Sequence, residues 1–365
     1  MNRTTDLIVP ALCIALGAGA LVAQTDETKT TATAQQKDQE TAPAQKLSWP
    51  KDAGRRVCSV AGRDFTLRDL LTHIAERHYP GMLKLMDTPA GLGYLQSPKV
   101  AEWVRAFADV KSLEIEAAAR ELDFEKVREQ LGEPLKQDFE AWMKTYQDQR
   151  AQQGSPLELT QERVNLLLTD YQRDEGLRTE VQGWLDVLVP ETPLDAGGKI
   201  REFYEDHPQY FGGVVTLAQI FVETRDPRTL ELKTGKDREA SLAKLADIRA
   251  RLLADGSNFE EVARLMSDDH RTAREGGRLD GVKRFDQRLP AAICRTAWNL
   301  KDGQISDPFE SPYGVHIVKR IGYRHLYYVV FGDRIKADVA ATMRRIAQED
   351  LLFDLRRRFG TTLWY

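Results

Sequence analysis

The sequence predicts an α+β protein in which a mostly helical N-terminal region precedes a smaller domain of mixed helices and strands. Apolar residues repeat at helical spacing through most of residues 51–205. They repeat in the same way near residue 260, whereas the apolar residues from Val315 to Val318 alternate as in a strand. With 365 residues the chain is longer than one ordinary domain, so we expect two domains with connecting segments.

The composition is that of a soluble globular protein with no general affinity for nucleic acid. Charged residues make up 30% of the chain, hydrophobic residues make up 42%, and the net charge is -4. The sequence has no glycine-rich phosphate loop and no His/Cys cluster with zinc spacing. The acidic run at 260–269 falls on a helix and its exit, without converging ligands. We therefore expect no nucleic-acid partner, no metal and no small-molecule cofactor.

Residues 1–23 have the pattern of a secretory signal peptide. Arg3 gives a positive start, residues 8–22 are apolar and uncharged, and Ala23 offers a small residue for cleavage. The alternative is an uncleaved membrane anchor, although the apolar run is shorter than the roughly 20 residues of a spanning helix. Residues 24–50 contain few apolar side chains, which predicts a disordered linker. The mature chain is thus expected to be exported.

The helical region opens with a short hairpin. Residues 57–65 alternate as hairpin strands do, and Thr66 is placed to cap the helix that follows. Aromatic residues farther on, such as Trp184, form stripes at helical spacing, which belong either to a core or to an exposed groove for client polypeptides. Cys58 and Cys294 lie far apart in the sequence, which indicates two buried apolar side chains and no disulfide framework.

The C-terminal segment combines strand and helix signals. Residues 326–331 predict a strand, residues 334–359 a long helix with apolar residues among basic ones, and residues 361–365 a final short strand.

Several short motifs follow one another in the smaller domain, after a strand at 216–222. They are Ser267-Asp268-Asp269, Gly276-Gly277-Arg278-Leu279, Leu289-Pro290, Gly303-Gln304-Ile305 and Tyr313-Gly314-Val315-His316. The order of these motifs and the residues in them resemble the parvulin family of peptidyl-prolyl cis/trans isomerases. The resemblance runs from about residue 212 to residue 322 and implies a small antiparallel sheet flanked by helices.

The resemblance also implies a catalytic group of three residues. His316 matches the second of two family histidines, Asp269 matches the residue beside the twisting amide, and Gln219 replaces the first histidine. A glutamine can donate and accept hydrogen bonds, so it can support the ring of His316. Arg288 stands where the family commonly has a methionine. The expected substrate-binding residues are Met266, Gln287, Leu289, Ile293, Ser311 and Tyr313.

Rotation about an X-Pro bond faces a barrier of about 18 to 20 kcal/mol, although its two isomers differ by only ~1 kcal/mol. A catalyst needs an apolar pocket for the proline ring and a few polar groups that favour the twisted amide. Leu289 and Ile293, with Met266 and Phe285 as neighbours, offer such a pocket, although they can equally be ordinary core residues.

Residues 60–66, which open the helical region, and residues 200–211, which join it to the parvulin-like stretch, are similar to segments of the exported parvulin chaperones of the SurA, PrsA and PpiC type. This similarity implies a helical chaperone-like domain at 51–205 and a parvulin-like domain at 206–322. It also implies that the C-terminal strand and helix at 323–365 pack on the helical domain. The alternative is a helix that packs only on the parvulin-like domain.

The function that follows is an exported peptidyl-prolyl cis/trans isomerase and chaperone, located in the periplasm or cell envelope. Its partners would be unfolded or nascent exported polypeptides that contain X-Pro bonds. The alternative, favoured by Gln219, is a chaperone that binds clients without isomerising them. The sequence makes no prediction of oligomeric state.

Overall fold

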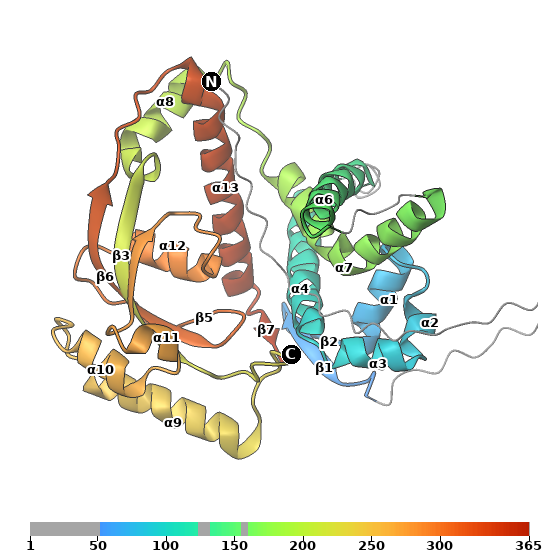
Figure 1. Ribbon diagram of the computed structural model, residues 1–365, viewed down its shortest axis with the longest axis horizontal. Helices are drawn as coiled ribbons and strands as arrows, with labels where there is room; N and C mark the ends of the chain where they lie inside the picture. Colours follow the sequence, from blue (N-terminus) through green and yellow to red (C-terminus); the bar gives the residue numbers. More distant parts are fainter. Residues whose placement is uncertain (1–51, 123–131, 155–159, 365) are drawn as a thin grey trace, which may run out of the picture. The chain divides into compact units, whose positions relative to one another are not determined.

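The computed structural model describes residues 52–122, 132–154 and 160–364. The predicted signal peptide (1–23) and linker (24–50) lie outside the described residues. Within these ranges helices predominate, and the strands form two small antiparallel sheets (Figure 1). The predicted α+β class is therefore confirmed. None of the helices in these ranges combines the length and apolar character needed to cross a membrane.

Elements are labelled as in Figure 1. The helices are α1 (Leu67–Arg77), α2 (Met82–Met86), α3 (Pro89–Leu95), α4 (Pro98–Ala119), α6 (Gly132–Gln152), α7 (Gln161–Leu188), α8 (Gly197–Asp206), the 3-10 turn η1 (Pro208–Tyr210), α9 (Gly235–Arg251), α10 (Phe259–Met266), α11 (His270–Ala273), α12 (Ala291–Asn299) and α13 (Asp333–Arg358). The strands are β1 (Arg56–Val60), β2 (Arg63–Thr66), β3 (Gly213–Val222), β4 (Arg278–Val282), β5 (Phe309–Glu310), β6 (Val315–His325) and β7 (Thr362–Leu363).

β1 and β2 form the predicted hairpin. Its turn consists of Ala61 and Gly62, whose φ angles of 52° and 75° suit a two-residue turn between twisted strands. Thr66 then caps α1, as predicted. Its Oγ1 accepts a hydrogen bond from the N–H of Asp69 at 3.3 Å, and the Asp69 carboxylate accepts one from the N–H of Thr66 at 2.7 Å.

Aromatic residues of the helical region face inward. Trp103 and Phe107 of α4 and Trp184 of α7 are each at most 2% exposed, in one core with α1 and the hairpin. Phe139 of α6 and Tyr171 of α7 form a second cluster, with ring centroids 5.6 Å apart. Of the two alternatives left by the sequence, these side chains fit the core.

Glu180 of α7 is 1% exposed and ties α7 to α1. The Nε2 atoms of His73 and His78 lie 2.9 and 2.8 Å from its Oε2, and Arg77 pairs with its Oε1. Burial opposes the charged carboxylate, but the two histidine hydrogen bonds and the Arg77 charge hold the pKa of Glu180 well below its usual value. Lys111 Nζ lies 3.3 Å from His73 Nδ1, so this nitrogen accepts and Nε2 carries the proton. Hydrogen bonds among these side chains therefore link α7 to α1 and to the residue that follows it.

The second sheet has the strand order β4-β3-β6-β5, with all pairs antiparallel (Figure 1). On one face, Ile293 and Ala297 of α12 pack in an apolar cluster with side chains of β3 and β6. On the other face, Phe259 of α10 and Ile248 of α9 pack with another set from the same strands. This helix-covered antiparallel sheet is the architecture that the parvulin resemblance implied.

The central strands bring the candidate site residues onto one face of the sheet. Gln219 of β3 lies opposite Val318 of β6, and Phe221 lies opposite His316. Leu217 and Val318 belong to the cluster under α12. Because side chains alternate along a strand, Gln219, Phe221 and His316 share that face.

The prediction of a strand at 326–331 is wrong. β6 ends at His325, and residues 326–331 are neither strand nor helix. β3 begins at Gly213, which is the partner of His325, so the residues after His325 have no neighbouring strand to pair with. The final short strand is present as β7, and its Leu363 pairs with Cys58 of β1.

The long helix α13 contacts both halves of the described chain. Its Val339 packs with Ile200 of α8, and its Arg356 pairs with Asp109 of α4 at 2.6 Å. It also reaches α12, where Arg295 donates to Asp350 at 2.7 Å. α13 therefore does not pack on the domain predicted at 206–322 alone. The domain boundaries at 205/206 and 322/323 stay predictions.

Both cysteines of the described residues are free and buried, as expected for apolar side chains. Burial raises the pKa of Cys58 to about 12 and that of Cys294 to about 11. Neither thiol is therefore primed for reaction at neutral pH.

Candidate active site

Asp269 lies between α10 and α11 and uses its whole carboxylate as an acceptor. Oδ1 accepts the N–H groups of Arg271 and Thr272 at 3.2 and 3.4 Å, which caps α11. Oδ2 accepts from Thr272 Oγ1 and from Gln219 Nε2, both at 2.7 Å. A carboxylate offers about four acceptor positions, so these four donors hold Asp269 in one orientation as an anion.

A glycine turn presses against the backbone of Gln219. Gly276 and Gly277 have φ angles of 69° and 81°, and a Cβ on Gly277 would lie 2.1 Å from the carbonyl oxygen of Gln219. The N–H of Gln219 donates to the carbonyl of Gly277 at 2.9 Å. Only glycine allows this approach, which explains the Gly276-Gly277 motif as a backbone requirement.

His316 is 4% exposed and sits between aromatic rings. Its ring centroid lies 4.9 Å from that of Phe221 and 5.8 Å from that of Phe309. Its Nε2 lies 2.7 Å from Ser311 Oγ, which also accepts the N–H of Tyr313 at 3.1 Å. Burial lowers the pKa of His316 to about 4, against a smaller opposing effect of the Asp269 charge. His316 is therefore neutral at neutral pH.

Gln219 does not support the ring of His316, contrary to the expectation from the sequence. Its amide nitrogen is bonded to Asp269. Its Oε1 and the Nδ1 of His316 are both buried, and neither has a hydrogen-bond partner within the described ranges. The Asp269 carboxylate is a stronger acceptor than a ring nitrogen of His316, so the amide N–H of Gln219 is directed to the carboxylate. Gln219 therefore connects β3 to Asp269, and His316 is held from the other side by Ser311.

Leu289 and Ile293 lie together on the face of the sheet that carries Gln219 and His316. They share an apolar cluster with Leu217 and Val318 of the central strands, and Phe309 packs against its edge. Ile293 is 1% exposed, so it belongs to the core, which is one of the two alternatives that the sequence left open. Leu289 is only partly buried, which leaves it available at the surface.

The four other predicted substrate-binding residues lie elsewhere or play another part. Met266 packs on the opposite face with Phe259, because α10 covers that side of the sheet. Ser311 is buried and bonded to His316, so it supports the ring instead of lining a surface. Tyr313 is 52% exposed at the turn between β5 and β6, and Gln287 is exposed in the loop before α12.

Sequence reasoning missed Thr272 and the aromatic neighbours of His316. Thr272 follows Asp269 by three residues, but a threonine at that helix position is no recognised capping signal, since the usual partner is Glu or Gln. Phe221 carried a usable signal, because strand alternation from Gln219 puts it on the same face. Phe309 lies in a strand of only two residues, too short for a periodic pattern.

Comparison with known proteins agrees with this geometry. The family model of the rotamase, or PPIC-type PPIASE, domain matches residues 220–322. Chaperone SurA from Saccharophagus degradans is 38% identical over 137 residues, which cover 37% of this chain and 29% of SurA. Foldase protein PrsA from Clostridium botulinum is 29% identical over 93 residues, covering 26% of this chain and 27% of PrsA. The chain thus spans less than a third of the length of either relative.

A shorter relative is matched over most of its length. Peptidyl-prolyl cis-trans isomerase Pin1 from Arabidopsis thaliana is 39% identical over 83 residues, which cover 23% of this chain and 67% of that protein. The family model matches the part of the chain that runs from β3 into β6 and contains the motifs quoted above. The chain therefore belongs to the parvulin-type family of peptidyl-prolyl cis-trans isomerases.

Proposed function

We propose that the chain is an exported peptidyl-prolyl cis/trans isomerase that also acts as a chaperone for unfolded polypeptides. The observation that carries the proposal is the Asp269 carboxylate, fixed by Gln219 and Thr272 and located at the strands that hold the neutral His316. The apolar pair Leu289 and Ile293 on the same sheet face supports it.

In this proposal, the partly exposed Leu289, backed by the buried Ile293, contacts the proline ring, and Asp269 lies beside the twisting amide. A planar amide carries partial negative charge on its oxygen, and a nearby carboxylate opposes that charge separation. The twisted amide has lost the resonance, so the carboxylate penalises it less and the barrier falls. No bond to the substrate has to form, and His316 with Ser311 keeps the floor of the site uncharged.

The clients proposed are unfolded or nascent exported polypeptides with X-Pro bonds, handled in the periplasm or cell envelope. The similarity to proteins named chaperone SurA and foldase PrsA supports a client-binding role. The signal-peptide pattern of residues 1–23 supports export.

The direct test is a refolding assay limited by proline isomerisation, with the full chain added as catalyst. We expect the natural chain to accelerate refolding and Asp269→Ala to remove most of the acceleration. Asp247→Ala is the matched control, because it removes an exposed carboxylate of α9 that pairs only with Arg251 among the described residues. Equal acceleration by the natural chain and Asp269→Ala would contradict the role of the site.

A second candidate function is a parvulin-like chaperone without turnover. The observation that favours it is the bond from Gln219 to Asp269, which leaves His316 Nδ1 unpaired in the part of the chain that the structure describes. Such a protein would prevent aggregation of a client that lacks proline, yet leave proline-limited refolding unchanged. In that case, recovery of isomerisation in Gln219→His would identify a module that has lost its activity.

A further inference from the structure

We infer that Glu349 and Asp350 of α13 are positioning residues for the proline pocket, although they lie outside the module that the family model matches. The inference rests on the proposed function. It follows from the loop at 283–290, which joins β4 to α12 and carries Gln287 and Leu289.

The loop is organised from within by Asp286. Its carboxylate accepts the N–H of Arg288 at 3.0 Å and the N–H of Lys283 at 3.4 Å. The Arg288 guanidinium bonds to both of its oxygens, at 2.8 and 2.6 Å, and these hydrogen bonds hold the pKa of Asp286 below its usual value. Arg288, which replaces the common family methionine, is thus turned toward its own loop. The internal bonds fix the loop's shape but not its placement against the rest of the chain.

Placement comes from Arg284, a loop residue whose side chain is buried against α13. Its NH2 donates to Glu349 Oε2 at 2.8 Å. Its Nε and NH1 are buried and have no hydrogen-bond acceptor among the described residues. A buried guanidinium with a single carboxylate partner depends on that partner, because an uncompensated buried charge is unstable. Removal of Glu349 should therefore displace Arg284 and, with it, the loop.

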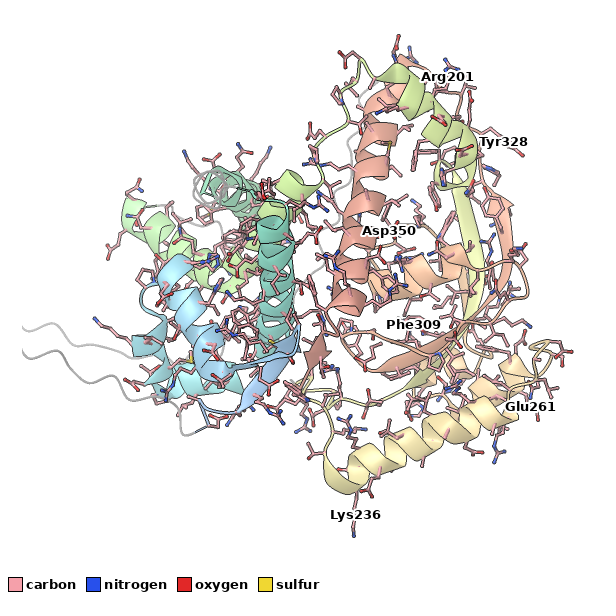
Figure 2. All side chains as sticks on the ribbon, turned by 180° about the vertical axis from the view of Figure 1, so that it is seen from behind. Arg201, Lys236, Glu261, Phe309, Tyr328 and Asp350 are labelled. Atoms are coloured by element: carbon pink, nitrogen blue, oxygen red, sulfur yellow. The ribbon has the colours of Figure 1, made fainter. Side chains whose placement is uncertain are left out.

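Neighbouring contacts bind the same helix face to the loop and to α12. Arg345 Cζ lies 4.0 Å from the ring centroid of Phe285. Arg295 of α12 donates to Asp350 Oδ1 at 2.7 and 3.2 Å, and its Cζ lies 4.0 Å from the ring centroid of Phe353. Asp350 is labelled on α13 in Figure 2, where the helix runs beside α12 as it does in Figure 1. Residues at this helical spacing share one side of α13.

α13 is also anchored in the helical region. Arg344 pairs with Asp186 of α7 at 3.0 Å, and Gln348 donates to the same carboxylate at 2.9 Å. Arg356 makes two bonds to Asp109 of α4, at 2.8 and 2.6 Å. α13 is thus fixed to the helical region by these pairs and holds the pocket loop through Glu349 and Asp350, so these two residues set the position of Leu289 and Ile293 from outside the module.

The test compares the full natural chain with Glu349→Gln/Asp350→Asn, which removes both charges and keeps side-chain size. Asp354→Asn is the matched control, since Asp354 lies on the same helix in an exposed pair with Arg357. In the double variant we expect faster amide hydrogen exchange at 283–298, and about a tenfold rise in KM for an X-Pro peptide with kcat nearly unchanged, which corresponds to ~1.4 kcal/mol of binding. Asp354→Asn should match the natural chain in both measurements.

Hydrogen exchange and kinetics separate this inference from the proposed function. Unchanged exchange at 283–298 in the double variant overturns the positioning role, whether or not the chain is an isomerase. Faster exchange with an unchanged KM overturns the link to the pocket. If the natural chain has no isomerase activity, the proposed function is wrong. Faster exchange in the double variant would then still support the contact between α13 and the loop at 283–290. If the double variant does not fold, Glu349→Gln alone is measured in the same way.

Discussion

At the scale of single residues, the candidate site contains one carboxylate whose acceptor positions are all occupied. Thr272 and Gln219 both donate to Asp269 Oδ2, and backbone N–H groups occupy Oδ1. In the proposed function such a group acts through a fixed charge, because proton transfer or nucleophilic attack would need a free lone pair. His316, neutral and buried, complements it without adding a second charge.

Thr272→Val tests how much the fixed orientation contributes. The substitution keeps the side-chain volume and removes the hydroxyl that donates to Asp269. We expect a loss of about 1 kcal/mol, or roughly fivefold in kcat/KM for an X-Pro peptide. Thr272→Ser keeps the hydroxyl and should retain most of the activity. Equal losses in the two variants would show that the hydroxyl does not matter.

His316 predicts a pH dependence of stability. Burial depresses its pKa from 6.5 to about 4 in the folded state, so the unfolded chain binds this proton first. The contribution of the neutral His316 to the free energy of unfolding is therefore fully present above pH 6.5. It is lost as the pH falls toward 4, by up to about 3 kcal/mol. Urea unfolding of the natural chain at pH 7 and pH 5 should show the decline, and His316→Gln should flatten it. The same slope in both proteins would assign the decline to other groups.

Sequence motifs singled out Asp269 and His316 as candidates but did not predict the bond between Gln219 and Asp269. The order of the motifs places a residue on a strand or in a turn. The alternation of side chains along a strand then shows which face of the sheet that residue occupies. Which acceptor an amide chooses depends on where α11 places the Asp269 oxygens, and this is set by the tertiary approach of Gly277 to β3. That approach has no periodic signal. Thr272 was missed for a local reason, since a threonine three residues after Asp269 is no recognised capping signal.

At the scale of elements, helix caps and strand registers agree with local sequence rules. The wrong prediction concerns a segment that has no neighbouring strand to pair with. Thr66 caps α1 as its sequence indicates. Residues 326–331 have strand-forming side chains but lie beyond the first residue of β3, so no strand stands beside them. Strand formation depends on a neighbour as well as on propensity.

Thr66→Ala should destabilise the protein by about 1 kcal/mol, because it removes the side-chain acceptor of the α1 capping box. Thr234→Ala provides the control. Thr234 also occupies a helix N-cap, that of α9, but its side chain makes no capping hydrogen bond. Chemical denaturation should separate the two variants, and equal effects would argue against the cap as the cause.

At the scale of the whole molecule, α13 connects the helical region to the isomerase module within one compact unit, Ser48–Tyr365. The sequence predicted this helix and its return to the helical region, but not its contact with the pocket loop. Its basic and acidic residues look like a solvated surface in sequence. Their pairing with Arg284 and Asp109 requires elements more than 50 residues away, which no local pattern reveals.

Arg356→Ala tests this connection. Asp109 is buried, so loss of its paired guanidinium leaves an uncompensated carboxylate, and we expect a destabilisation of about 3 kcal/mol. Arg357→Ala, at an exposed neighbouring position of the same helix, should change stability by less than about 0.5 kcal/mol. Similar unfolding midpoints for the two variants would mean that the Arg356 pair contributes little.

The central claim is that the chain isomerises X-Pro bonds through Asp269. The most direct measurement is NMR exchange spectroscopy on a proline peptide, with the full chain at catalytic concentration. Our account predicts exchange cross-peaks between the cis and trans forms with the natural chain, and their loss with Asp269→Asn, which keeps the size of the side chain and removes its charge. Cross-peaks of equal intensity with the two proteins, or none with the natural chain, would contradict it.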